Sequence, residues 1–90
     1  MSTATPTTLL TFPCSYPIKI MGRRTDTFAQ DILAIVIHHA PDFVPASMEM
    51  RPSKQGKYLG LTVTINAHSR EQLDALYQAL CAHQSVAMVL

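Results

Sequence analysis

The sequence predicts one domain of the α+β class, and three observations predict it. Apolar and polar residues alternate over residues 16–21 and 58–66, which is the period of a half-buried strand. Residues 25–40 and 69–83 instead repeat apolar side chains every three to four positions, the period of an amphipathic helix. The chain has 90 residues, enough for one hydrophobic core.

The first strand and the first helix follow from the pattern over residues 16–41. The even-numbered residues of Tyr16–Met21 share one face, and Gly22 is expected to end the strand. Thr25 is the expected N-cap of a helix that runs to Ala40. The run 32–37 is also compatible with a buried strand, but the length of the whole segment and its flanking cap and proline favour a helix.

Three further strands are predicted. Alternation over residues 46–51 gives the second strand, and residues 53–56 have the composition of a turn. Residues 58–66 form the clearest strand, with aliphatic side chains on one face and polar ones on the other, a pattern typical of antiparallel sheets. Residues 86–90 form the last strand.

The order of the elements predicts the ferredoxin-like βαββαβ sandwich, with a four-stranded antiparallel sheet and two helices on one face. Ser69, followed three residues later by Gln72, has the spacing of a capping box at the start of the second helix. We also expect right-handed crossovers to place the first and third strands side by side in the same direction. Residues 1–15 are expected to be a flexible N-terminal tail, and residues 16–90 the domain.

The charge and apolar content of the chain indicate which classes of partner and which cell compartment to expect. The net charge is +1, too weak to predict binding to nucleic acid or to an anionic membrane. No segment is long and apolar enough for a signal peptide or a transmembrane helix, so we expect a cytoplasmic protein with Cys14 and Cys81 reduced. Only 14% of the residues are charged while 48% are hydrophobic, so we expect a partner, including a second copy, to cover part of the surface.

Six short motifs occur in order along residues 9–90: Phe12-Pro13, Ile20-Met21-Gly22, His39-Ala40-Pro41, Pro52-Ser53-Lys54-Gln55-Gly56-Lys57-Tyr58, Thr64-Ile65-Asn66-Ala67 and Met88-Val89-Leu90. In this combination the chain resembles the YbeD-like family of small uncharacterised bacterial proteins. The resemblance implies a ferredoxin-like fold similar to the ACT regulatory domain, no established activity, and a link to lipoate metabolism through gene neighbourhood. It implies no catalytic residue and no cofactor.

One anion site is conceivable from the loops that precede the two helices. If both helices start at the same end of the sheet, their free N–H groups and nearby arginines can hold a carboxylate or phosphate. The alternative, which the frequency of helix caps favours, is that the arginines are solvated and the hydroxyls are plain caps. The residues of this candidate ligand site are Arg23, Arg24, Thr25, His68, Ser69 and Arg70.

A metal site is disfavoured, although His38 and His39 close the first helix and His83 closes the second. Parallel helices would bring these ends together, but adjacent histidines on a helix point about 100° apart. No cysteine or carboxylate joins them at a ligand spacing. We therefore predict no metal.

The solvent face of the sheet is predicted to carry Lys19, Met21, Glu49, Arg51, Tyr58, Thr62 and Thr64. RNA-recognition domains of this topology stack bases on aromatic residues of the two central strands, whereas here Tyr58 stands alone among threonines. The pattern is more typical of a solvated or subunit-covered face than of RNA binding.

The sequence leaves three hypotheses for function. The first is a non-enzymatic, ACT-like regulatory or adaptor domain that self-associates and binds a protein or a small anionic metabolite. The second is a small acylphosphatase-like hydrolase in which an arginine holds the anion. The third is a weak RNA-binding module. No Walker loop, nucleophile elbow, CxxC pair or zinc motif is present.

Overall fold

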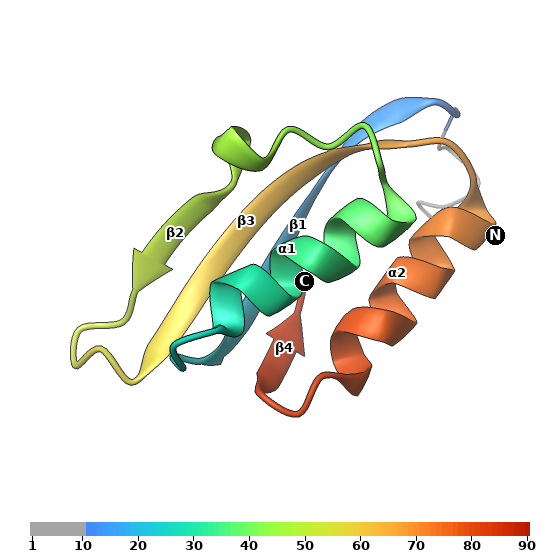
Figure 1. Ribbon diagram of the computed structural model, residues 1–90. Coiled ribbons are helices and arrows are strands. Elements are labelled where there is room, and N and C mark those ends of the chain that lie inside the picture. Colours follow the sequence, from blue (N-terminus) through green and yellow to red (C-terminus); the bar gives the residue numbers. More distant parts are fainter. Residues whose placement is uncertain (1–10) are drawn as a thin grey trace, which may run out of the picture.

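The computed structural model describes residues 11–90, which form one sheet and two helices (Figure 1). The elements are β1 (Cys14–Arg23), α1 (Phe28–His39), the 3-10 turn η2 (Pro45–Ser47), β2 (Glu49–Pro52), β3 (Tyr58–Ala67), α2 (Arg70–Ala82) and β4 (Val86–Val89). The first ten residues of the expected tail lie outside the described residues. Cys14 and Ser15, also assigned to that tail, already belong to β1.

The predicted ferredoxin-like sandwich is confirmed. The strands follow the order β2-β3-β1-β4, every neighbouring pair is antiparallel, and both helices cover one face of the sheet (Figure 1). The expectation that the first and third strands run in the same direction is wrong, because β1 and β3 pair antiparallel over ten residues each. Each crossover joins parallel strands that are not adjacent: β3 lies between β1 and β2, and β1 lies between β3 and β4.

The two helices run in opposite directions because the strands that precede them do. Gln72, in the first turn of α2, donates from Nε2 to the backbone carbonyl of His39 at the end of α1, at 2.9 Å. At the other end, His83 Nε2 lies 3.0 Å from Oδ2 of Asp31, near the start of α1. The N-termini of the helices therefore lie at opposite ends of the sheet.

The core lies between the sheet and the helices. Alternate residues of β1 and β3 are buried, together with Phe28, Ile32 and Val36 of α1 and three leucines of α2. The ambiguous run 32–37 is helical, as predicted. Burial of each large apolar side chain contributes about 1.5–3 kcal/mol, so helical spacing of these residues is strongly favoured. Neither helix within residues 11–90 has the length and apolar content to cross a bilayer.

The predicted start of α2 is confirmed, whereas the predicted start of α1 is wrong. Gln72 N donates to Oγ of Ser69 at 3.0 Å, as the capping-box spacing predicts. By contrast, α1 starts at Phe28 with Thr27 as N-cap, not at Thr25. The Thr25 carbonyl accepts a hydrogen bond from the Phe28 N–H, so residues 25–28 form a turn before the helix.

Two strand ends also differ from prediction. Gly22 does not end β1: it pairs with Leu59 on one side and Val86 on the other, next to an irregularity in the β1–β4 register. The second strand begins only at Glu49, because Pro45–Ser47 form a 3-10 turn in place of extended chain. The Ser47 hydroxyl stabilises that turn by donating to the Val44 carbonyl at 2.6 Å.

Prolines occupy two open stretches of strand in the sheet. β4 covers β1 only as far as Lys19, which exchanges two backbone hydrogen bonds with Leu90. Pro17, two residues earlier, presents its nitrogen to the same side, where no strand of the described chain pairs. Pro52 lies on the edge strand β2. Because proline has no N–H to donate, these two stretches are poor templates for another strand, whereas the outer edge of β4 carries no proline.

Two glycines provide a matched test of the packing. A Cβ at Gly22 would lie 2.5 Å from Phe28 Cζ and closer still to the Ser85 carbonyl oxygen, whereas one at Gly60 meets nothing nearer than 3.5 Å. We predict that Gly22→Ala lowers the free energy of unfolding by about 1–3 kcal/mol, as overpacking does. Gly60→Ala should be neutral or raise it by up to about 1 kcal/mol. Urea denaturation measures both; equal midpoint shifts would contradict the packing described.

Candidate functional site

The open face of the sheet is the surface that neither helix covers. Strand alternation and register place nine neighbouring residues on it, drawn from all four strands and the C-terminus: Lys19, Met21, Glu49, Arg51, Tyr58, Gly60, Thr62, Met88 and Leu90. Arg23 and Thr64 continue the same face along β1 and β3. Of the six large apolar side chains that are well exposed in residues 11–90, four lie here, namely Met21, Tyr58, Met88 and Leu90. The face is therefore more apolar than the sequence pattern alone indicated.

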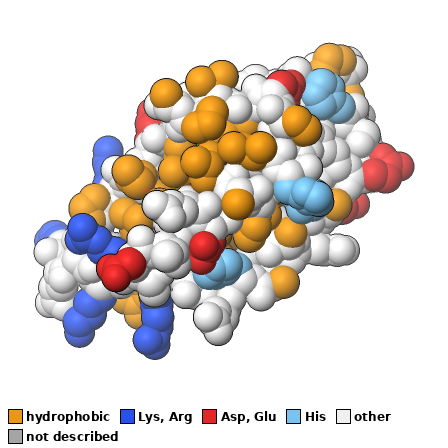
Figure 2. Space-filling view, viewed as in Figure 1, with side chains coloured by type: hydrophobic (Ala, Val, Ile, Leu, Met, Phe, Trp, Pro, Cys, Tyr) orange, Lys and Arg blue, Asp and Glu red, His pale blue; other side chains and the backbone are white. Residues whose placement is uncertain are grey.

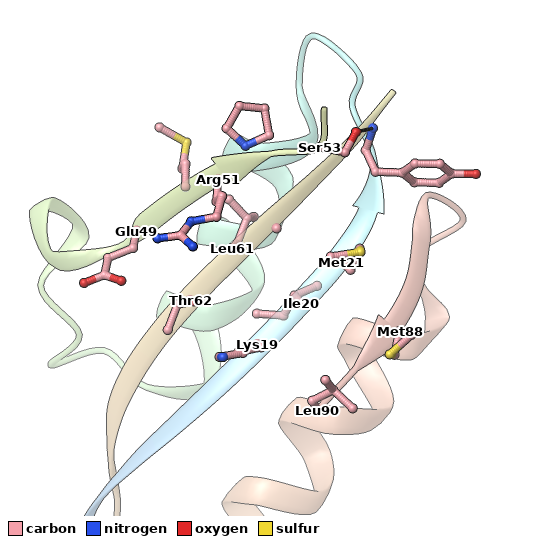
Figure 3. Close-up of a pocket in the computed structure, with 14 residues that line it drawn as sticks. Lys19, Ile20, Met21, Glu49, Arg51, Ser53, Leu61, Thr62, Met88 and Leu90 are labelled. Atoms are coloured by element: carbon pink, nitrogen blue, oxygen red, sulfur yellow. Dashed lines mark hydrogen bonds between the residues drawn. The ribbon is translucent and has the colours of Figure 1, made fainter. Parts of the chain in front are cut away.

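Register aligns these side chains in rows across the sheet. Arg51 pairs with Gly60, Gly60 with Met21, and Met21 with Met88, so one row crosses all four strands. A second row runs parallel to it and contains Glu49, Thr62, Lys19 and Leu90. Figure 3 shows the labelled members of both rows on the same face. Side chains in such rows are direct neighbours, roughly 5 Å apart at Cβ.

A hollow of about 830 Å³ lies over these rows. Its centre is Gly60, which has no side chain. The nearest atoms to a Cβ at this position would be the Arg51 carbonyl oxygen at 3.5 Å and Met21 Cε at 3.6 Å. The hollow therefore has a backbone floor, bordered by Tyr58 and Thr62 along β3 and by Arg51 and Met21 across it.

Positive charge dominates this face. Lys19 and Arg51 line the hollow, and alternation along β1 places Arg23 beside Tyr58. Glu49 is the only lining residue with a carboxylate side chain. Within the described residues, none of the three cations lies within 4 Å of a carboxylate. They are available to a partner's negative charge.

The positive charge continues onto the β2–β3 turn. Arg24 N donates to the Lys57 carbonyl at 2.9 Å, which holds the Arg24 side chain near Gly56, and Lys54 belongs to the same turn. Figure 2 shows lysine and arginine side chains gathered at this end of the molecule. Arg70, on α2, instead lies 3.8 Å from Asp74. The net charge of +1 thus conceals a strongly asymmetric distribution.

A second apolar surface lies on the helix side. Val44 and Met50 are each about 60% exposed, and Figure 2 shows apolar side chains gathered on this side of the molecule. A smaller hollow of about 390 Å³ adjoins Val44 and Asp42. This surface provides a comparison for tests of the open face.

The structure does not bring the six residues of the predicted anion site together. Three of them lie at the end of β1 and just after it, and three follow β3, and ten-residue antiparallel strands separate these groups by roughly 30 Å. The expectation that the two groups meet assumed parallel central strands. The first group is Arg23, Arg24 and Thr25 at the basic end, and the second is His68, Ser69 and Arg70 at the start of α2.

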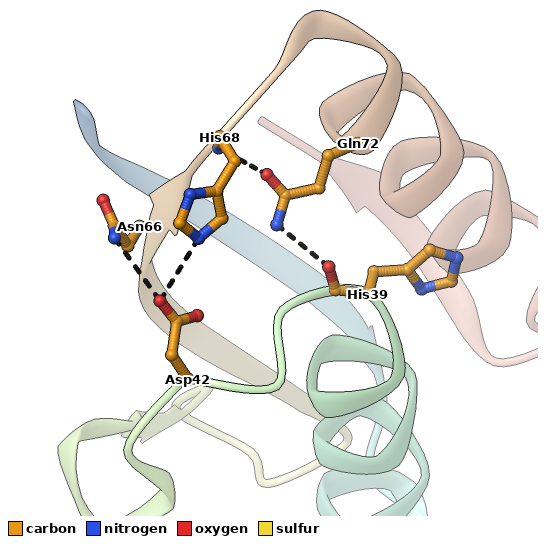
Figure 4. Close-up of polar contacts among 5 residues, drawn as sticks. All are labelled: His39, Asp42, Asn66, His68 and Gln72. Carbon is orange, nitrogen blue, oxygen red and sulfur yellow. Dashed lines mark hydrogen bonds and ion pairs between the residues drawn. The ribbon is translucent and has the colours of Figure 1, made fainter. Parts of the chain in front are cut away.

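His68 instead belongs to a polar network that joins the helices (Figure 4). Oδ2 of Asp42 lies 3.3 Å from His68 Nε2 and accepts a hydrogen bond from Asn66 Nδ2 at 3.4 Å. The Asn66 hydrogen bond, with a further contribution from His68, holds the pKa of Asp42 below its ordinary value. Gln72 accepts from the His68 N–H at 2.6 Å and donates to the His39 carbonyl. Since these groups satisfy one another, we interpret the network as structural.

The histidines at the helix ends do not meet. His38 and His39 contact each other edge to face, while His83 lies at the opposite end between Phe28 and Asp31. Within residues 11–90, no three histidine, cysteine or acidic side chains are arranged to hold a metal ion. We expected parallel helices to bring these helix ends together. The helices are antiparallel, so this expectation is wrong.

Comparison with known proteins identifies the family. The family described as "Protein of unknown function (DUF493)" matches residues 7–90. The chain belongs to this family. DUF493 relatives include UPF0250 proteins of Bordetella pertussis, 54% identical over 91% of this chain and 90% of the relative, and of Nitrosomonas europaea, 51% identical over 96% and 99%. The YbeD-like resemblance of the sequence motifs is confirmed.

Solved structures show that the DUF493 fold is ACT-like. The ACT domain from GTP pyrophosphokinase of Chlorobium tepidum matches with a TM-score of 0.67 at 18% identity, covering 86% of this chain and 83% of that domain. Protein HP0495 from H. pylori matches with a TM-score of 0.70 at 18% identity, covering 99% and 89%. At this identity the likeness concerns the fold alone.

The sequence pattern predicted six of the residues that line the hollow but missed what creates it. Lys19, Met21 and Tyr58 were expected on the solvent face, and they lie there. Gly60 was read as one polar-face position among others, although an isolated glycine inside a strand is a recognised sign of close approach. The contribution of Met88 depends on the β1–β4 register, which has no local signal in the sequence.

The role of Gln72 can be tested against another glutamine of α2. Gln72→Ala removes the hydrogen bonds to the His68 N–H and the His39 carbonyl, and should lower the free energy of unfolding by about 1–2 kcal/mol. Gln78 is exposed, so Gln78→Ala should change it by less than about 0.5 kcal/mol. Urea denaturation gives both values, and similar losses in the two variants would argue against the network.

Proposed function

We propose that this DUF493 chain is a non-catalytic, ACT-like regulatory module that binds another protein through the open face of its sheet. The observation that carries the proposal is the hollow over Gly60, bordered by exposed Met21 and Tyr58 on a face that no helix covers. Exposed apolar patches rimmed by polar groups mark interaction sites on small domains.

The chemistry of the open face favours binding over catalysis. Its nine residues include two methionines, a leucine and a threonine, but no histidine and no cysteine. Methionine side chains are flexible and polarizable, which suits adaptable contact with a partner. Regulation then requires only that the partner's two functional states differ in their contacts with this face.

We also propose that the module works in the cytoplasm. Cys14 is partly buried, Cys81 is exposed, and both are free thiols. Free, exposed thiols are typical of a reducing compartment. This agrees with the expectation from the sequence.

Removal of the apolar border tests the function. Met21→Thr combined with Met88→Thr shortens both side chains while keeping a residue that favours strands. In quantitative capture from extracts of the native cell, proteins retained by the wild type should be lost from this double variant. Val44→Thr, which changes an apolar side chain exposed elsewhere, should retain them. Thermal unfolding of each variant checks that the fold is intact.

Two results would overturn the proposal. Retention of the same proteins by the double variant, with loss only from Val44→Thr, would transfer binding to the helix side. Turnover of acetyl phosphate by the purified wild type would show that the module is catalytic.

A further inference from the structure

The three glycines of the chain differ in the structural constraint at each position. Gly56 has a φ of +73° in the β2–β3 turn, a conformation that side chains disfavour. Gly22 has no room for a Cβ against Phe28 and Ser85. Gly60 has neither constraint: its φ is not positive and a Cβ would make only ordinary contacts. The fold does not require a glycine at position 60.

A glycine in a strand without a structural reason carries a cost. It destabilises the strand by about 0.5–1 kcal/mol relative to alanine, because it loses more conformational freedom on folding. Such glycines often mark a place where another molecule approaches the backbone closely. Gly60 lies in the central strand β3, at the centre of the hollow, and its open side faces outward. The absence of a side chain at Gly60 therefore leaves space for another molecule above the strand.

The surroundings of Gly60 specify what can enter that space. Met21 and Tyr58 offer apolar contact on two sides, so a bulky apolar side chain fits against them. Arg51 lies next to Gly60 in the same row, Lys19 lies in the neighbouring row, and Arg23 follows along β1. Carboxylates on either side of an inserted apolar residue would reach these cations, and arginine binds carboxylates bidentately.

We propose, building on the proposed function, that the partner presents a bulky apolar side chain flanked by aspartate or glutamate. The apolar side chain inserts over Gly60, and the carboxylates pair with Arg51, Lys19 and Arg23. The occupant is thus an acidic segment of another protein.

Charge argues against a second copy as the occupant. Two open faces in contact would bring three cations and one carboxylate against an identical set, and like charges across an interface are unfavourable. A small metabolite is also a poorer fit, because small-molecule sites enclose most of the ligand, whereas no helix covers this face of the sheet (Figure 1). An acidic segment complements the charge and needs no enclosure.

The test is selection of a random peptide library, displayed on phage, against the full chain and two variants. Gly60→Thr fills the space with a good strand former, and Thr64→Val changes an exposed position of the same strand outside the hollow. We expect peptides selected on the wild type to be rich in Asp and Glu around Leu, Met or Phe. They should bind Thr64→Val equally and Gly60→Thr roughly ten- to a hundred-fold more weakly.

Several outcomes would overturn the inference. These are selection of neutral or basic peptides, failure to select any peptide, or equal affinity for Gly60→Thr with its fold intact by thermal unfolding. A wild type that self-associates in sedimentation velocity, with a monomeric Gly60→Thr, would make a second copy the occupant. If Met21→Thr with Met88→Thr loses its captured proteins while no acidic peptide is selected, the proposed function stands and only this inference fails.

Discussion

The antiparallel ladder between β1 and β3 determines the rest of this structure. Ten residues of each strand pair without interruption, from Cys14 opposite Ala67 to Arg23 opposite Tyr58. Because the strands end at opposite ends of the sheet, the helices that follow them start at opposite ends and pack antiparallel. The ladder therefore separates two kinds of surface: a basic end around the β2–β3 turn, and a polar network around Asp42 and His68 near the start of α2.

The same ladder also limits how a partner can approach. One face of the sheet is covered by α1 and α2, and two open stretches of strand carry Pro17 and Pro52, which cannot donate a hydrogen bond to an added strand. The short β4 leaves the open face free while adding Met88 to its apolar side chains. Docking by side-chain contact on the open face thus requires no change in the sheet, whereas extension of the sheet along these two stretches would leave backbone groups unpaired.

Local features could be predicted from the sequence, and non-local ones could not. The helix over residues 32–37 and the Ser69 cap follow from the spacing of residues that are close together in the sequence. The direction of β1 relative to β3 depends on contacts between residues about 35 to 53 positions apart, so the site that combined Arg23 with Ser69 had no local signal against it. Gly22 and Gly60 look alike in the sequence, and the packing of Phe28 and the Ser85 carbonyl against Gly22 distinguishes them.

Gly60 illustrates how the proposed binding surface differs from a merely exposed one. A surface without function has no reason to forgo the stability that a side chain at the centre of a strand provides, and Thr62 and Thr64 show that this strand accepts β-branched residues on the same face. The unpaired cations beside the glycine make the same point, since charges of one sign held close together destabilise a fold unless a partner neutralises them. Space and charge lie side by side because register places Arg51 opposite Gly60 in the same row, so the single acidic partner that we propose accounts for both features.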